Sequence, residues 1–173
     1  MANVTNLLPL GGVATAAIAY IGGVLTKPLQ DHFAFMRRKH DLRVCLYSEI
    51  GTVCSRYVRF AYHSPLEVRV QCPNDAFKLA MTIPEVFYAL EEKHFFEGVY
   101  RVMLNYERKP RRTKLARQVM AYIDEAILLG RLNRRLLWKH CDIEGREHID
   151  LLPKKRFTPV EFEKELERFD GAA

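Results

Sequence analysis

Residues 42–62, LRVCLYSEIGTVCSRYVRFAY, carry the periodicity that decides the fold. Their apolar side chains recur on one helical face: Leu42, Leu46, Ile50, Val53, Tyr57 and Phe60. At 100° per residue these positions form a stripe about 80° wide, which is typical of a helix that packs on a core. Pro28 suits the first turn of such a helix, and Ser64–Pro65 would end it. We therefore predict a long helix from Pro28 to about Tyr62.

The segment before this helix carries no charge. Met1–Thr26 contains no Asp, Glu, Lys or Arg, and within it Leu7–Leu25 (LLPLGGVATAAIAYIGGVL) is mostly apolar. A helix of about 20 such residues crosses a hydrocarbon core of about 30 Å, so we predict a transmembrane helix here. A cleaved signal peptide would need basic residues in Met1–Asn6, which has none. A buried core helix is the other alternative, but the uncharged run is long for one.

Basic residues follow the uncharged segment, whereas none precedes it. They are Lys27, Arg37, Arg38, Lys39 and Arg43. The positive-inside rule therefore places the C-terminal part in the cytoplasm and the N-terminus outside, most simply at a bacterial cytoplasmic membrane. We expect these five side chains to set the topology and to contact anionic lipid headgroups.

Small residues recur within the predicted membrane span. They are Gly12, Thr15, Ala16, Ala19 and Gly23. A spacing of four places such residues on one helical face, where a second helix can approach closely. We interpret them as a helix-association face.

The remainder of the chain predicts a small helical bundle. Alternation of apolar and polar residues around Pro73–Asp75 predicts a short β-hairpin over about 66–82, with an irregular connector as the alternative. Thr82 with Glu85, and Thr158 with Glu161, match the capping-box pattern that opens helices. Further helices are expected at 85–92, 95–108, 113–140 and about 158–169, with a loop at 141–157.

The predicted fold is therefore mainly α. One N-terminal transmembrane helix precedes a long helix and a small cytoplasmic helical bundle. The expected domain organisation is a membrane anchor at 1–27, a basic juxtamembrane helix at 28–43, a helical cytoplasmic domain at 44–140, and a C-terminal loop and short helix at 141–173.

Charge and cysteine content limit the possible functions. The net charge is +6 and the isoelectric point is near 9.2, yet the four cysteines include no Cys-x-x-Cys pair. The sequence between His140 and His148 holds several metal-ligand residue types, but their spacing matches no zinc motif. We therefore expect no metal and no cofactor. A basic cluster at 108–117 has two interpretations, a solvated helix connection and a phosphate-binding surface.

One short pattern, Arg135-Leu-Leu-Trp-Lys-His140, resembles the Arg-x4-6-His element of HEPN ribonucleases. These enzymes are helical bundles that usually act as dimers. The resemblance covers six residues. It implies that Arg135 would stabilise the phosphate and that His140 would transfer protons during attack by the RNA 2′-hydroxyl. On a straight helix the two side chains lie about 140° apart, so a shared pocket needs the helix end or a partner chain.

These features favour a single-pass, membrane-anchored helical protein that acts as a non-enzymatic interaction or assembly module. The expected partners are anionic lipids and another protein or a second copy of the chain. The alternative function is a membrane-tethered ribonuclease that uses Arg135 and His140, with RNA as its partner.

Overall fold

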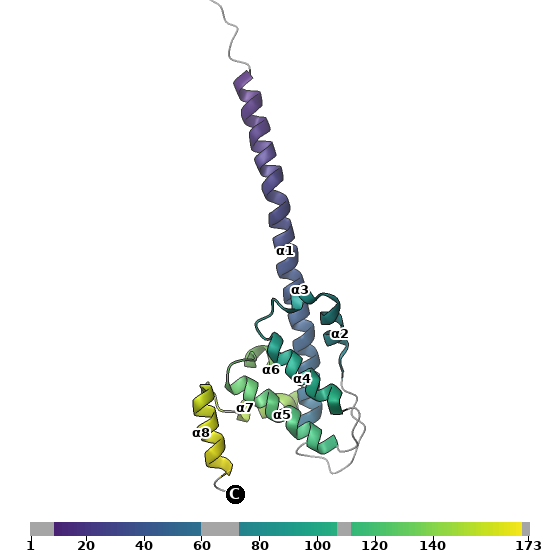
Figure 1. Ribbon diagram of the computed structural model, residues 1–173, viewed down its shortest axis with the longest axis vertical. Helices are drawn as coiled ribbons and strands as arrows, with labels where there is room; N and C mark the ends of the chain where they lie inside the picture. The colour runs from purple at the N-terminus through teal and green to yellow at the C-terminus, as the bar shows by residue number, and fades with distance from the viewer. Residues whose placement is uncertain (1–8, 60–72, 107–111, 171–173) are drawn as a thin grey trace, which may run out of the picture. The chain divides into compact units, whose positions relative to one another are not determined.

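The computed structural model describes residues 9–59, 73–106 and 112–170, with side chains described for 26–59, 73–104 and 114–167. Within these ranges the chain forms eight helices and no strand, so the mainly α prediction is confirmed (Figure 1). The helices are α1 (Pro9–Val58), α2 (Asp75–Thr82), α3 (Pro84–Phe87), α4 (Lys93–Tyr106), α5 (Arg112–Leu128), α6 (Arg134–His140), α7 (Ile143–Leu151) and α8 (Pro159–Asp170). The chain divides into two compact units, Met1–His40 and Asp41–Ala173.

The first unit contains the beginning of α1. The helix starts at Pro9 and continues through Pro28, so the prediction that a second helix begins at Pro28 is wrong. A proline ring removes one backbone donor, and here that loss does not end the helix. From Thr26 to Met36 almost every side chain is exposed, including the large apolar residues Leu29, Phe33 and Met36.

No helix in the described part of the chain is both long and apolar enough to cross a membrane. The side chains of the predicted span Leu7–Leu25 lie outside those that the structure describes. The same holds for the predicted helix-association face. Both stay predictions.

The second unit is built around the remainder of α1. Leu42, Leu46, Ile50, Val53 and Tyr57 are buried, as the stripe predicted, and Phe60 lies outside the described residues. Burial also extends to a neighbouring face that carries Tyr47, Cys54 and Val58. The buried face is therefore about 160° wide at 100° per residue, which indicates that other helices cover α1 on more than one side.

The prediction of a β-hairpin over about 66–82 is wrong for the part of this segment that the structure describes. Its second arm is α2, and its first arm at 66–72 lies outside the described residues. Phe77 of α2 stacks on Tyr100 of α4, with ring centroids 4.3 Å apart. This contact holds one face of a short helix on the core, whereas Leu79 and Met81 remain exposed. A short run of alternating residues does not distinguish such a helix from a strand.

The predicted helix at 113–140 is two helices, α5 and α6. Gly130 has a φ of 69°, which glycine adopts without steric cost, and this residue lies in the turn that ends α5. Asn133 then caps α6, because its side-chain oxygen accepts a hydrogen bond from the Leu136 N–H at 3.0 Å.

The predicted loop at 141–157 contains a helix, α7. Asp142 caps this helix by accepting a hydrogen bond from the Gly145 N–H at 3.0 Å. The Asp142 N–H in turn donates to the Ser55 hydroxyl of α1 at 3.0 Å. At the same junction a Cβ on Gly51 would lie 2.6 Å from the His140 carbonyl oxygen. Close packing on α1 therefore fixes the place where α6 ends and α7 begins.

A buried carboxylate, Glu92, joins three parts of the second unit. Its Oε1 accepts hydrogen bonds from the Arg43 guanidinium, with Nε at 2.9 Å, and from the Tyr47 hydroxyl at 3.0 Å. Tyr47 also accepts a hydrogen bond from the Asn133 N–H at 2.8 Å. Burial is the largest cause that raises the pKa of Tyr47, so this hydroxyl stays protonated and can donate to Glu92. The network connects α1, the residue before α4 and the cap of α6.

We predict that Glu92→Gln lowers the free energy of unfolding by about 2 kcal/mol, because hydrogen bonds to charged groups contribute more than neutral ones. Glu91→Gln is the matched control, since Glu91 is exposed and accepts no hydrogen bond from a described residue. Chemical denaturation of the two variants measures the difference. Equal stabilities would show that the Glu92 network contributes nothing.

Candidate functional site

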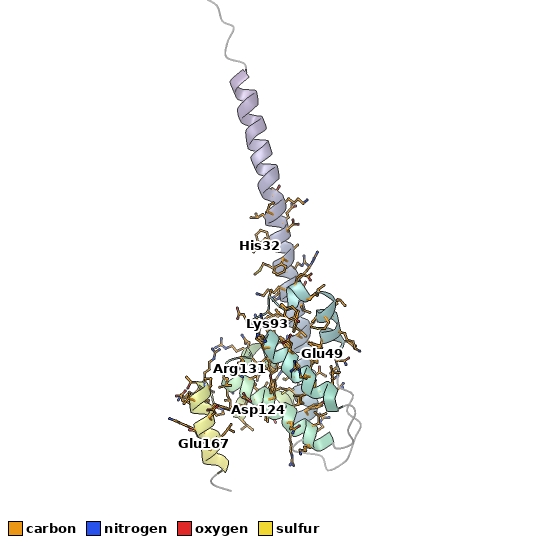
Figure 2. All side chains as sticks on the ribbon, viewed as in Figure 1. His32, Glu49, Lys93, Asp124, Arg131 and Glu167 are labelled. Atoms are coloured by element: carbon orange, nitrogen blue, oxygen red, sulfur yellow. The ribbon has the colours of Figure 1, made fainter. Side chains whose placement is uncertain are left out.

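The buried polar side chains of the second unit serve structural roles. Glu49 of α1 accepts hydrogen bonds from the Tyr100 hydroxyl of α4 and from the Ala76 N–H of α2, the latter at 2.9 Å (Figure 2 labels Glu49). Among the described residues no buried side-chain nitrogen or oxygen lacks a hydrogen-bond partner. These buried polar groups are therefore engaged in hydrogen bonds within the fold.

One histidine–carboxylate pair has the composition of an acid–base site. His148 of α7 and Asp124 of α5 are joined at 2.8 Å, and their side chains are 14% and 19% exposed. A catalytic dyad also needs a nucleophile or a substrate site next to the imidazole. Asp124 lines a surface cavity, and His148 is not among the residues that line that cavity. The pair instead connects α5 to α7.

Two buried thiols lie in contact where α1 meets the junction of α6 and α7. Cys54 donates a hydrogen bond to Cys141, which raises the pKa of Cys54 and lowers that of Cys141. Both side chains are almost completely buried, whereas Cys45 is exposed. Burial excludes substrates from the Cys54–Cys141 pair, so its role is packing.

The residues of the ribonuclease-like pattern do not share a cavity. Arg135 and His140 are the second and last residues of α6, a helix of seven residues. Arg135 lines a surface hollow, and His140 is not among the residues that line it. The His140 backbone instead packs against Gly51 of α1. The structure does not bring the two side chains together within one chain.

A wide apolar cleft of about 690 Å³ lies between α5 and α8. Its floor comes from both helices and from the segment that joins α7 to α8: Leu128, Leu152, Pro153, Phe157, Phe162 and Leu166. The charged residues of its lining are all acidic, namely Asp124, Glu125 and Glu165. Figure 2 labels Asp124 on α5 and Glu167 farther along α8. An apolar cleft with an acidic rim is complementary to a basic amphipathic segment.

The capping box predicted at Thr158 is confirmed and positions α8 beside this cleft. The Thr158 N–H and hydroxyl donate to Glu161 at 2.8 and 3.0 Å, and the Glu161 N–H donates to the Thr158 hydroxyl at 3.3 Å. Lys155 adds an ion pair to Glu161 at 3.0 Å. The backbone hydrogen bond from Thr158, followed by the contacts with Lys155 and the Thr158 hydroxyl, lowers the pKa of Glu161 from 4.5 to about 2.

We predict that the first turn of α8 loses stability as the pH falls from about 4.5 towards 2. A carboxyl with a lowered pKa in the folded state stabilises that state above its unfolded pKa, and protonation removes this contribution. The protection factors of the Glu161 and Phe162 amides, which compare the intrinsic exchange rate at each pH with the measured one, should fall over this pH range. The Glu161→Gln variant should have lower protection factors at neutral pH and show no such fall. A wild-type rate that follows only the intrinsic pH dependence would contradict the prediction.

A second surface hollow, of about 560 Å³, has the opposite charge. Its lining residues come from α6, α7 and the segment after α7: Arg134, Arg135, Trp138, Lys139, Asp150 and Lys154. Arg135, Lys139 and Lys154 are exposed and form no ion pair with any residue that the structure describes. The sequence does not predict this hollow as one site, because Asp150 and Lys154 lie next to α6 only in the folded structure.

The predicted headgroup contacts divide into two groups. Lys27, Arg37 and Arg38 are exposed and Lys39 is partly exposed. Arg43 is engaged with Glu92 and lies over the Tyr47 ring, 5.7 Å from its centroid. Four of the five side chains therefore remain accessible to lipid, and Arg43 has a structural partner.

Three of the metal-ligand residue types between His140 and His148 take part in other contacts. Cys141 packs on Cys54, Asp142 caps α7, and Glu144 pairs with Arg59 at 2.8 Å. Within the described ranges no three His, Cys, Asp or Glu residues are grouped to hold a metal ion.

Comparisons with known proteins return no match: no protein-family model, no curated protein and no solved structure is significantly similar to this chain.

Proposed function

We propose that this chain is a membrane-attached, non-enzymatic assembly module in which the α5–α8 cleft of one copy holds the exposed part of α1 from a second copy. The proposal rests on two surfaces of the same chain that are complementary in charge and both apolar. An apolar cleft has only acidic residues among its charged lining, and an exposed helical stretch is both apolar and basic.

The proposed occupant is residues 26–41 of α1. Leu29, Phe33 and Met36 are 59%, 65% and 47% exposed. Their spacing of i, i+4 and i+7 places them within about 60° on one helical face, which is the pattern of a helix that docks in a groove. Arg37, which is exposed, and Lys39, which is partly exposed, flank this face on its two sides at 100° per residue.

The cleft offers the matching surface. Phe162 and Leu166 of α8 and Leu128 of α5 provide apolar contacts at helical spacing. Glu125, which also pairs with Arg131 at 3.6 Å, and Glu165 lie among them, where Arg37 and Lys39 of a docked helix would be attracted. Each copy carries both surfaces, so a reciprocal exchange between two copies closes the assembly with two-fold symmetry.

The proposed association predicts a concentration-dependent dimer. The native mass of the full chain in a mild neutral detergent should correspond to two chains. Phe33→Glu should shift the mass to one chain, because it introduces an acidic residue opposite Glu125 and Glu165 and removes an apolar anchor. Among the aromatic rings that the structure describes, Phe33 contacts only that of the neighbouring His32, so the fold should be unaffected.

The control is Ile143→Glu, which changes a side chain that is 72% exposed and belongs to neither surface. It should leave the dimer intact. Leu166→Lys, on the cleft side, should weaken the dimer as Phe33→Glu does. A wild-type mass of one chain at all concentrations, or a mass that includes a different polypeptide, would contradict self-association.

Membrane attachment is the second part of the proposal, and the sequence supports it. Met1–Thr26 has no charge, and exposed basic residues follow at Lys27, Arg37 and Arg38. An apolar segment next to basic residues is the arrangement that positions a protein at an anionic cytoplasmic surface.

Attachment by this segment predicts that the full chain stays with the membrane pellet during extraction with alkaline carbonate. The double variant Ile18→Arg, Ile21→Arg should move to the supernatant, because each arginine costs about 3 kcal/mol at the centre of a membrane helix. The double variant Leu151→Arg, Val160→Arg adds the same charge at exposed positions of the second unit and should remain in the pellet. Release of the wild-type chain would contradict membrane attachment.

A further inference from the structure

We propose that the basic hollow formed by α6, α7 and the segment after α7 binds a compact phosphate group, either of a soluble phosphorylated metabolite or of a phospholipid headgroup. This hollow shares no lining residue with the α5–α8 cleft, so the inference goes beyond the proposed assembly function.

The charge of the hollow fits a doubly charged anion. Four of its lining side chains are cationic, and Asp150 is the single carboxylate. Arg134 is occupied by backbone carbonyls, which leaves Arg135, Lys139 and Lys154 to face the hollow without a salt bridge to any described residue. Three such cations repel one another, and a phosphate monoester, with a charge near −2, would relieve this repulsion.

The walls of the hollow are held in place before any ligand binds. The Arg134 guanidinium of α6 donates hydrogen bonds to the carbonyls of Ile149, Leu152 and Pro153, the last two at 2.9 Å. These contacts cap the C-terminal end of α7 and attach it to α6. The Trp138 indole N–H also donates to Asp150 at 3.1 Å. A binding surface that is already positioned loses less conformational entropy when a ligand binds.

Trp138 is the aromatic side chain of the hollow. Its side chain is 37% exposed, and the Arg146 guanidinium lies over its ring, 4.6 Å from the centroid. A surface that binds single-stranded nucleic acid needs several aromatic platforms along a basic groove. Trp138 is the sole tryptophan of the chain and the single aromatic residue of this hollow. These features favour one phosphate group over a polynucleotide.

The single tryptophan also reports on binding. Titration of the full chain, in a neutral detergent, with inorganic phosphate or with dioctanoyl phosphatidic acid should change Trp138 fluorescence saturably, and calorimetry gives the affinity independently. Equal affinity for the two probes would identify the phosphate group alone as the ligand. Much tighter binding of phosphatidic acid, with no response to dioctanoyl phosphatidylcholine, would identify a lipid headgroup.

Three variants test the assignment of residues. Lys139→Glu should weaken binding at least about tenfold, because it places a negative charge beside the anion. Asp150→Asn should strengthen binding severalfold, because it removes the one carboxylate and keeps an acceptor for the Trp138 N–H. Lys164→Glu makes the same charge change on α8, outside the hollow, and should leave the affinity unchanged.

Three outcomes would overturn the proposal. The first is the absence of saturable binding of either phosphate probe by fluorescence and by calorimetry. The second is identical affinity of the Lys139→Glu and Lys164→Glu variants. The third is tighter binding of a single-stranded RNA oligonucleotide than of both compact probes, which would identify a polynucleotide surface.

Discussion

The Glu92 carboxylate imposes a constraint that the rest of the second unit must satisfy. A buried charge is costly unless it is paired and hydrogen-bonded, and Glu92 obtains its partners from Arg43 and Tyr47 on successive turns of α1. Tyr47 then accepts the Asn133 N–H, which fixes the start of α6. The position of α6 determines which side chains can reach the end of α7. The basic hollow, which α6 and α7 line, therefore depends on the buried Glu92 network.

Elements whose deciding interactions are local could be predicted from the sequence. The stripe that includes Leu46 and Ile50 is buried because a helix repeats every 3.6 residues, whatever packs against it. The capping box at Thr158 is confirmed, but the same pattern at Thr82 is not. Thr82 is the last residue of α2 and its hydroxyl donates to the Leu79 carbonyl at 2.7 Å, so Ile83 precedes Pro84 as the cap of α3. The capping-box pattern therefore does not predict a helix start where the threonine already belongs to the preceding helix.

The candidate surfaces could be predicted only in part. The basic, amphipathic character of residues 26–41 follows from the sequence, because all the residues that define this surface lie on one helix. The basic hollow is not readable in this way, since Lys154 and Asp150 approach Lys139 only after Arg134 has capped α7. The α5–α8 cleft also depends on the turn at Gly130, which the sequence prediction placed inside a continuous helix. Surfaces that need two or more elements require the tertiary structure.

The two surfaces of the second unit carry opposite charge, and this separation makes each selective. A basic helix such as residues 26–41 is attracted to the rim that Glu125 and Glu165 form, and it is repelled by the hollow that contains Arg135 and Lys139. A phosphate group is attracted to the basic hollow and is repelled by the acidic rim. The charges that would attract the proposed ligand of one site would therefore repel that ligand from the other site. Because both sites are exposed, salt weakens this discrimination at each of them.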